Sequence, residues 1–345
     1  MRLKLTNKTN RTYVAKPAMH IVLLLMFIIP ITSRSQQISV DSAVGAPSPI
    51  SQYMYSGPFR CIAVLPPNPG RIRLVAGLNV VAYTGSLIAL NEAWYKGHPR
   101  TGFHTFNDSR EWQQVDKVGH AWSAYNLGKY SADLWKWTGI PHKKAVWIGG
   151  LSGAAYLTVI ELLDAHSSRW GWSWADMGAN VLGSGMFISQ ALLWKEQRIQ
   201  FKFSFHKKSY GASIDPRANE LFGSSLAART LKDYNGQTYW LSFNLKSFFR
   251  ESGLPAWLNV AGGYGAEGML GGFENKWTNT DGSIVTRYDI HRKRQFYIAP
   301  DIDLTKIKTN KKSIRTVLNI LNAIKFPAPA LEFSEGKVKG HWLYF

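Results

Sequence analysis

Four long, mostly apolar stretches with helical spacing lie in the first 200 residues of the chain. They cover residues 72–95, 110–137, 142–167 and 174–196. Each is long enough for a helix of about 20 to 28 residues. Pro141 suits the first turn of the third helix, and Ser173 with Asp176 resembles a capping box for the fourth. Because short connections favour antiparallel neighbours, we predict a four-helix bundle-like domain over 71–198.

After Lys195 the spacing changes from helical to alternating. Phe201, Phe203 and Phe205 alternate with polar residues, which predicts a strand. Further strands are predicted over 238–245, 257–266, 284–290, 294–304 and 338–345, with turns at Asn235-Gly236 and Asp281-Gly282 and one helix at about 313–325. We therefore predict an α+β fold, in which a β-rich C-terminal domain over 199–345 forms a curved sheet or a small barrel.

The first 35 residues have the features of a secretory signal peptide. A basic leader precedes a short apolar run from Ile21 to Ile31, and the small residues Ser33 and Ser35 follow. The run is shorter than the roughly 20 residues that a transmembrane helix needs. Residues 36–70 are rich in serine, proline and glycine, which predicts an extended linker. We expect the chain to be exported.

The chain is basic, and this bears on its partners. Residues 1–35 hold six of the 41 Lys and Arg residues and none of the 22 acidic ones, so 41 − 6 = 35 basic residues remain and the formal charge is 35 − 22 = +13. An exported protein of this charge is expected to meet a membrane or outer-membrane lipid surface rather than nucleic acid. The alternative is that the charge is solvated surface only.

Two uncharged stretches mean that the helices could lie either in water or in a membrane. They run from Leu74 to Leu90 and from Met177 to Trp194, and each is near the lower length limit for a membrane span. The helices are also rich in glycine, which lets helix backbones approach closely in membranes and in tight soluble bundles. Membrane embedding or close membrane contact therefore stands beside a soluble bundle as an alternative.

Polar pairs interrupt three of the predicted helices. The pairs are Asp116 with His120, Glu161 with Asp164, and Asp176 with Asn180. Members of a pair are three or four residues apart, so they share one helix face. Burying an ionised carboxylate costs several kcal/mol unless it is paired, protonated or bound to a cation. We therefore predict that the pairs, with Glu92 of the first helix, meet in one polar cluster inside the bundle.

Two kinds of chemistry fit such a cluster. Carboxylate-rich helical bundles hold metals with oxygen ligands and imidazoles, although the sequence names neither a metal nor a cofactor. General acid–base catalysis would instead use a histidine beside a carboxylate. The predicted catalytic cluster is Asp116, His120, Glu161, Asp164 and Asp176, with Lys117, Arg169 and Asn180 as predicted substrate-binding residues. No familiar enzyme motif supports catalysis.

Each acidic residue also has an ordinary structural interpretation. Asp176 would cap the fourth helix, Asp116 would pair with Lys117 or Arg110, and Glu161 would pair with Arg169 on the surface. For a single residue this interpretation is as good as the functional one. It is weaker for all the pairs together, because the surrounding helix faces are apolar and leave few wet positions.

The same residues resemble a known family. The runs are Asp116-Lys117-Val118-Gly119-His120, Glu161-Leu162-Leu163-Asp164, and Trp172 to Gly183. Over about residues 75–200 they resemble the YfiM-like predicted periplasmic proteins, an uncharacterised family, which implies an envelope protein of unknown activity. Many YfiM-like members are lipoproteins, whereas the only cysteine here, Cys61, does not follow an apolar run ending in small residues. We therefore predict no lipid attachment.

A more distant resemblance is to the VanZ-like membrane proteins, which are associated with glycopeptide resistance. They share the order Asp-Lys-x-x-His, Glu, and Asp-x-x-x-Asn-x-x-Gly, but their Glu is commonly followed by Gln where this chain has Asp164. Neither family supplies an established reaction.

The leading hypothesis is an exported cell-envelope protein, in the periplasm or outer membrane, with a membrane-associated structural or binding role. One alternative is an envelope lipid- or glycan-modifying enzyme that uses the carboxylate and histidine cluster. Another is an outer-membrane β-barrel with a helical plug, because the chain ends in the aromatic run His341-Trp342-Leu343-Tyr344-Phe345.

Overall fold

The computed structural model describes residues 66–345 except residues 96, 97 and 280. The predicted signal peptide (1–35), Cys61 and nearly all of the predicted linker (36–70) lie outside the described residues. The four long helices are α2 (Pro69–Leu90), α3 (Val115–Trp137), α4 (His142–Ala165) and α5 (Trp174–Leu193). The π-helical turn η2 (Asn91–Tyr95) continues α2, and the 3-10 turn η3 (Glu111–Gln114) precedes α3. All four predicted helices are confirmed.

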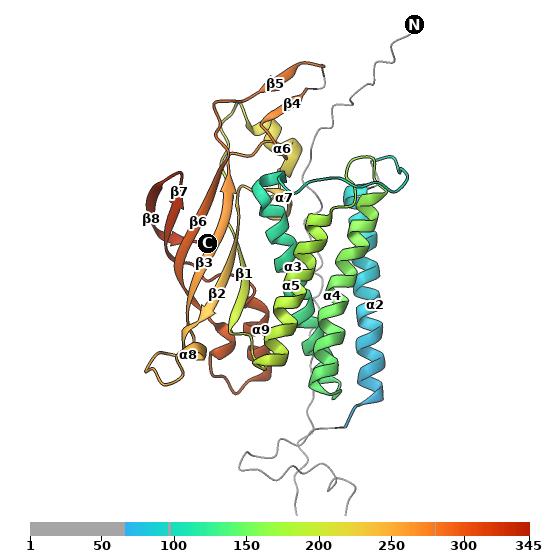
Figure 1. Cartoon of the computed structure of the whole chain (residues 1–345), viewed down its shortest axis with the longest axis vertical. Coiled ribbons are helices and arrows are strands. Elements are labelled where there is room, and N and C mark those ends of the chain that lie inside the picture. Colours follow the sequence, from blue (N-terminus) through green and yellow to red (C-terminus); the bar gives the residue numbers. More distant parts are fainter. Residues whose placement is uncertain (1–65, 96–97, 280) are drawn as a thin grey trace, which may run out of the picture.

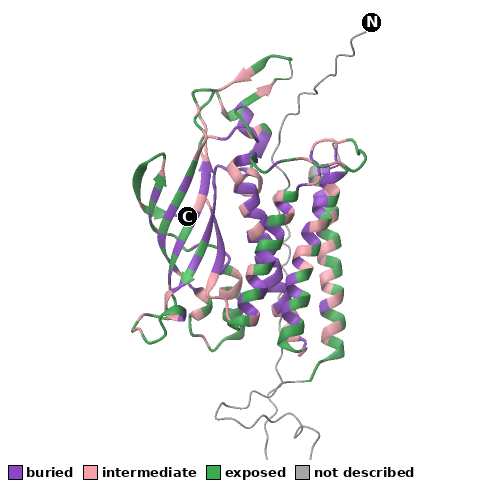
Figure 2. Ribbon diagram, in the orientation of Figure 1, coloured by how far each residue is buried: buried purple, intermediate pink, exposed green. Residues whose placement is uncertain are grey.

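Helix α3 is the centre of the helical layer and packs against both α4 and α5 (Figure 1). Glycine makes this close approach possible at two points. A Cβ atom on Gly149 would overlap the backbone of Ala132, and one on Gly183 would overlap the carbonyl group of Ala121. Helix α3 is mostly buried, whereas α2 lies at the outside of the layer with most of its surface exposed (Figure 2).

The second half of the chain forms a six-stranded antiparallel sheet in the order β1-β2-β3-β6-β7-β8. Its strands are β1 (Ile199–Phe205), β2 (Gln237–Asn244), β3 (Leu258–Glu267), β6 (Lys293–Ile302), β7 (Ala328–Ser334) and β8 (Lys337–Tyr344). A separate two-stranded sheet contains β4 (Lys276–Thr278) and β5 (Ile284–Thr286). The short helices are α6 (Asp215–Phe222), α7 (Leu226–Lys232), α8 (Leu245–Phe248), η4 (Leu304–Lys306) and α9 (Lys312–Leu321).

The sheet of the described residues is open and does not close into a barrel (Figure 1). The predicted α+β fold with a curved sheet is therefore confirmed, and the small barrel is wrong. The outer-membrane barrel with a helical plug is wrong for the same reason, because the helices cover one face of an open sheet instead of filling a closed one. Phe203 of β1 and Tyr239 of β2 pack on Trp122 of α3 at this face.

Two strands, β4 and β7, were not predicted from the sequence. Strand β7 begins in the proline-rich segment 326–330, and proline disfavours a strand interior because it donates no ladder hydrogen bond. In the structure Pro329 lies at an irregularity between β7 and β8, where the register shifts between Ala328 and Ala330. A proline is tolerated at such a bulge because the ladder is already interrupted.

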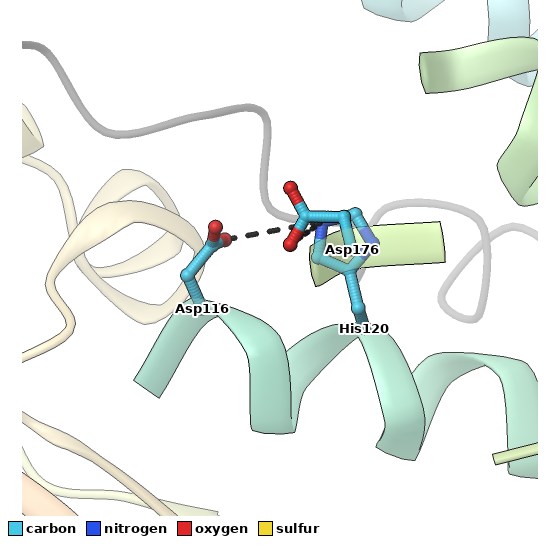
Figure 3. A group of neighbouring side chains, drawn as sticks. All are labelled: Asp116, His120 and Asp176. Carbon is cyan, nitrogen blue, oxygen red and sulfur yellow. Dashed lines mark ion pairs between the residues drawn. The ribbon is translucent and has the colours of Figure 1, made fainter. Parts of the chain in front are cut away.

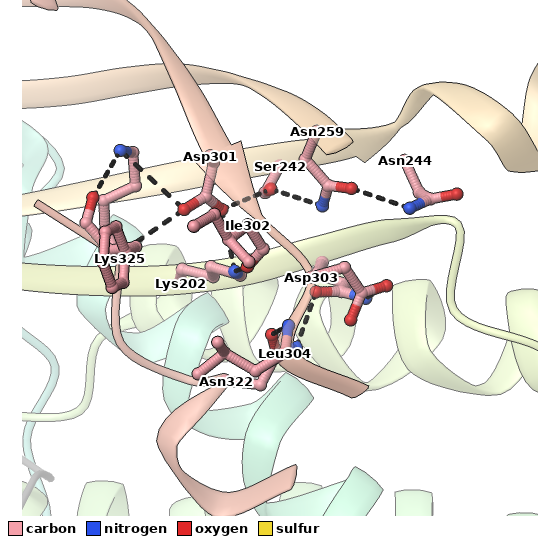
Figure 4. A network of polar contacts seen from close by, with 12 residues as sticks. Lys202, Ser242, Asn244, Asn259, Asp301, Ile302, Asp303, Leu304, Asn322 and Lys325 are labelled. Atoms are coloured by element: carbon pink, nitrogen blue, oxygen red, sulfur yellow. Dashed lines mark hydrogen bonds and ion pairs between the residues drawn. The ribbon is translucent and has the colours of Figure 1, made fainter. Parts of the chain in front are cut away.

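A buried polar network connects strands of the sheet with the segment after α9 (Figure 4). Lys202 and Asp301 have no exposed side-chain surface, and Lys202 Nζ lies 2.7 Å from Asp301 Oδ2. Ser242 Oγ donates to the same carboxylate at 2.6 Å. Lys325 Nζ lies 3.8 Å from Asp301 Oδ1 and donates to the carbonyl oxygens of Pro300 and Phe326 at 2.9 and 2.8 Å. The network thus joins β1, β2 and β6 to the segment before β7.

The change from helices to strands falls close to the predicted domain boundary, since α5 ends at Leu193 and β1 begins at Ile199. The two layers nevertheless share one hydrophobic core, to which α3 contributes Tyr125 and β1 contributes Phe201. The division into domains 71–198 and 199–345 therefore stays a prediction.

Candidate functional site

An unusual backbone turn sets the direction in which α3 begins. Trp112, Gln113 and Gln114 have φ values of 47°, 51° and 63°, in the left-handed region that costs about 1–2 kcal/mol for a residue with a Cβ. The sheet holds this turn in place. Tyr264 of β3 donates to the Gln113 carbonyl oxygen, and Arg294 of β6 donates to Gln114 Oε1 at 2.7 Å. The strained turn therefore fixes the first residues of α3, which carry the candidate site.

Lys117, on the first turn of α3, lies among three carboxylates. Its Nζ atom is 2.7 Å from Asp108, 2.9 Å from Asp116 and 2.7 Å from Asp176. These acidic side chains are 1%, 4% and 0% exposed, against 11% for the lysine side chain. Strong attraction is expected, because water screens little at such burial. Lys117 is therefore the ammonium group that joins the loop before α3 to the start of α5.

His120 lies one turn further along α3, on the same face as Asp116, and Asp176 of α5 points between them (Figure 3). The Nδ1 atom of His120 is 3.2 Å from Asn180 Oδ1. Its Nε2 atom faces three carboxylate oxygens at 4.0, 3.9 and 3.7 Å, which belong to Asp116, Glu161 and Asp176. These separations are longer than hydrogen bonds, which are about 2.7–3.2 Å.

The start of α5 explains why Asp176 is part of this cluster. Ser173 is the N-cap, as predicted, and its Oγ atom accepts from the Asp176 backbone N–H at 3.0 Å. In a capping box the side chain three residues on would bond back to the Ser173 N–H. Here Glu161 Oε2 accepts that N–H at 3.3 Å. The carboxylate of Asp176 is therefore directed to Lys117, and capping does not account for it.

The cluster includes two residues that the sequence analysis missed. Asp108 precedes α3, contacts Lys117 and accepts a hydrogen bond from Ser173 Oγ. Tyr234, in the turn before β2, donates to Asp116 Oδ1 at 2.7 Å. Burial, followed by the negative charge of Asp116, raises the pKa of Tyr234 well above its ordinary value, so the phenol keeps its proton and donates.

Gly119 is needed for the approach of the sheet to α3. A Cβ atom there would lie 2.7 Å from the Tyr239 hydroxyl oxygen. The glycine of the run Asp116 to His120 therefore has a packing reason, and Tyr239 of β2 closes the side of the cluster that faces the sheet.

The other predicted residues divide between the cluster and its surroundings. Asp164 is buried but accepts from the hydroxyl of Tyr95 at 2.6 Å. Arg169 has its Nη1 atom 3.0 Å from His98 Nε2, and Glu92 is exposed. Of the predicted residues, the structure brings together Asp116, Lys117, His120, Glu161, Asp176 and Asn180. The predicted place of Glu92 inside the bundle is wrong, because Glu92 is exposed.

The burial of the cluster limits what it can do. Four carboxylates of Asp108, Asp116, Glu161 and Asp176 face one ammonium group and one imidazole, and each of the four is at most 4% exposed. Burying several carboxylates together is costly unless protons or cations offset their charge. The site is suited to a proton or a small cation, whereas a bulky substrate would need an opening.

Comparison with known families supports the exported location. Residues 104–194 match a family described as "Predicted periplasmic lipoprotein (DUF2279)". The match runs from the loop before α3 to the residue after α5, and it contains every cluster residue except Tyr234. The description bears out the predicted export to the periplasm or outer membrane. No curated protein and no solved structure matches the chain.

Proposed function

We propose that the chain is a membrane-associated envelope protein with a structural or binding role, which contacts lipid through α2 and the apolar surfaces beside it. The observation that carries this proposal is the exposure of α2. We also propose that its helical part is related to the YfiM-like proteins and, more distantly, to the VanZ-like proteins. The match to a family of predicted periplasmic lipoproteins supports the first of these relationships.

Helix α2 is apolar around its circumference, and the residues that the structure describes cover little of it. Among its 22 residues only Val75, Ser86 and Leu90 are buried. Val80 and Val81 are 64% and 70% exposed. A helix that is apolar all round is usually buried in a core or in a membrane. At about 1.5 Å per residue α2 is about 33 Å long, close to the roughly 30 Å of a bilayer core.

Helix α4 extends this apolar surface. By length and composition, α2 and α4 are the two described helices that could cross a membrane. They are joined by a Tyr83–Tyr156 ring contact at 5.0 Å and by a hydrogen bond of 2.9 Å between Ser86 and Tyr156. Trp147 and Leu151 of α4 are 42% and 55% exposed. These side chains add lipid-compatible surface beside α2.

Basic side chains lie at one end of the two apolar helices. Arg71 and Arg73 begin α2, and Lys143 and Lys144 begin α4. The two ends are neighbours, because the Asn68 N–H donates to the Thr138 carbonyl oxygen at 2.9 Å. Lysine and arginine beside an apolar helix end suit anionic lipid head groups.

Membrane fractionation tests this proposal. We expect the parent protein in the membrane fraction, released by detergent but not by high salt or alkaline wash, because the contact is mainly apolar. Val80→Glu with Val81→Glu is expected to reduce the membrane-bound share several-fold, since carboxylates are costly in a bilayer. Ile284→Glu with Tyr288→Glu, at positions 61% and 86% exposed on the β4–β5 side, should leave it unchanged. A parent protein found in the cytosol, or washed off without detergent, contradicts the proposal.

A second candidate is an envelope lipid- or glycan-modifying enzyme, favoured by the meeting of His120 with Asp116, Glu161 and Asp176. His120→Ala and Glu161→Ala are then expected to accumulate as folded protein and fail to complement a strain that lacks the gene. His104→Ala is the control, because His104 lies outside the cluster and faces the Trp170 carbonyl oxygen. Full complementation by both cluster variants contradicts a catalytic role.

A further inference from the structure

We propose that Asp116, His120 and Asp176, with Glu161 as a fourth ligand, bind one divalent first-row transition-metal ion such as Mn²⁺, Fe²⁺ or Zn²⁺. The proposal goes beyond membrane association and does not depend on it. It also does not require catalysis, because a buried cation can serve structure alone.

The spacing of the candidate ligand atoms supports a shared cation. One ligand atom each from Asp116, His120 and Asp176 lies within 4.8 Å of the others. His120 Nε2 is 3.7–4.0 Å from an oxygen of Asp116, Glu161 and Asp176. Two ligands at about 2.1 Å from a tetrahedral ion are about 3.4 Å apart. The three gaps from His120 Nε2 are therefore about 0.3–0.6 Å longer than this ligand spacing, and they are too long for direct hydrogen bonds.

The orientation of His120 gives an independent indication. Its Nδ1 atom faces the amide oxygen of Asn180, which can only accept, so the proton belongs on Nδ1 and the Nε2 lone pair points into the cluster. His120 is 5% exposed, and Nε2 forms no hydrogen bond within the described part of the chain. A hydrogen-bonded second nitrogen is the usual arrangement of a metal-binding histidine.

A buried donor next to His120 also lacks a partner. Asn180 is 1% exposed, and its Nδ2 atom makes no hydrogen bond to any residue that the structure describes. Buried polar groups are nearly always satisfied, so this atom indicates a water or other small ligand beside the imidazole. A hydrated metal ion would supply such an acceptor.

The carboxylates beside Lys117 and His120 form a negative environment that attracts cations. Lys117 contacts Asp108, Asp116 and Asp176, but it is a single ammonium group among four carboxylates when Glu161 is counted. Glu161 Oε1 faces His120 on the side away from the Ser173 N–H that its other oxygen accepts. A divalent ion between these groups would be stabilised by the nearby carboxylates.

The donor set selects the class of ion. An imidazole nitrogen with carboxylate oxygens suits Mn²⁺, Fe²⁺ and Zn²⁺, whereas Mg²⁺ and Ca²⁺ prefer oxygen ligands alone. The ligands come from α3, α4 and α5, so the ion would join the three central helices.

Metal titration of the full-length, detergent-purified protein after chelator treatment tests the site. We expect one equivalent of Zn²⁺ or Mn²⁺ to bind, with Mg²⁺ at least tenfold weaker. His120→Phe and Asp176→Asn should each weaken binding by more than about 100-fold, because loss of outer-shell partners alone costs 10–100-fold. The matched controls are Asp164→Asn, a buried carboxylate bonded to Tyr95, and His104→Gln, an imidazole outside the cluster. Both should bind as the parent does.

A second measurement, made on the parent protein, tests the proposal even if the cluster variants do not fold. Mn²⁺ bound to the parent should show coupling to an imidazole nitrogen in its electron paramagnetic resonance. Less than a fifth of an equivalent of bound metal in the parent, or bound Mn²⁺ without nitrogen coupling, overturns the proposal. Unchanged affinity in folded His120→Phe overturns it as well. Membrane fractionation is unaffected by these outcomes, so a failure here leaves the membrane proposal standing.

Discussion

Replacing Lys117 by methionine is expected to lower the free energy of unfolding by about 3–5 kcal/mol. The substitution removes the ammonium group that contacts Asp108, Asp116 and Asp176, and leaves three carboxylates within the protein. Methionine fills a similar volume, so the loss reflects charge more than packing. Chemical denaturation of the purified protein, with a chelator present in all samples, measures this effect without any contribution from bound metal.

A matched control exists on the same helix. Lys136 pairs with Asp133 at 3.1 Å, but these side chains are 36% and 38% exposed. Lys136→Met should therefore change stability by less than about 1 kcal/mol, the usual value of an exposed pair. Adding Asp108→Asn to Lys117→Met should recover part of the loss, because one carboxylate then needs no counter-charge. Equal losses for Lys117→Met and Lys136→Met would show that the buried cluster is not held by its lysine.

The sequence predicted the helical part of the fold well because its information is local. Apolar spacing and the capping residues Pro141 and Ser173 placed the helix ends within a few residues of α4 (His142–Ala165) and α5 (Trp174–Leu193). The same spacing put Asp116 and His120 on one face. No local pattern predicts that this face points into the protein. That inference came from the cost of burying carboxylates, which favours grouping them in one polar cluster.

The rest of the site depends on contacts between distant parts of the chain. Tyr234 meets Asp116 from 118 positions further along the sequence. Its neighbours Asn235 and Gly236 predicted a turn, but no local pattern tells which helix a turn will touch. Asp108 lies in a loop without periodicity, so only the packing of that loop against the start of α5 brings it to Lys117.

One local rule gave a competing interpretation that the structure does not favour. Ser173 and Asp176 have the spacing of a capping box, which made helix capping a good explanation of Asp176. The return hydrogen bond is instead made by Glu161, twelve residues earlier. A side chain from a neighbouring helix can replace a local cap, and this substitution is invisible to a pattern that looks only along one helix.

Replacing Asp301 by asparagine is expected to cost about 3–5 kcal/mol of stability at neutral pH. The carboxylate lies between Lys202 and Lys325, both without exposed side-chain surface, at 2.7 and 3.8 Å (Figure 4). Asparagine keeps the shape but leaves two ammonium groups facing each other in the interior. Thermal and chemical unfolding at several pH values measure the loss.

The pH dependence of this loss separates charge from shape. Burial, partly offset by Asp301, lowers the pKa of Lys325 to about 8 from its ordinary value near 10.5. The unfolded state binds more protons than the folded state between these values, so stability rises with pH there. Without Asp301 the folded-state pKa of Lys325 falls further, so the stability of the variant begins to rise at a lower pH than that of the parent. The stability difference between Asp301→Asn and the parent should therefore shrink as pH approaches 8.

The control is Asp289→Asn, in a pair where Asp289 is 62% exposed, which should show a small and nearly constant loss of stability. A deficit of Asp301→Asn that does not change from pH 6 to 8 would mean that lost hydrogen bonds, such as that from Ser242, outweigh the unpaired lysines.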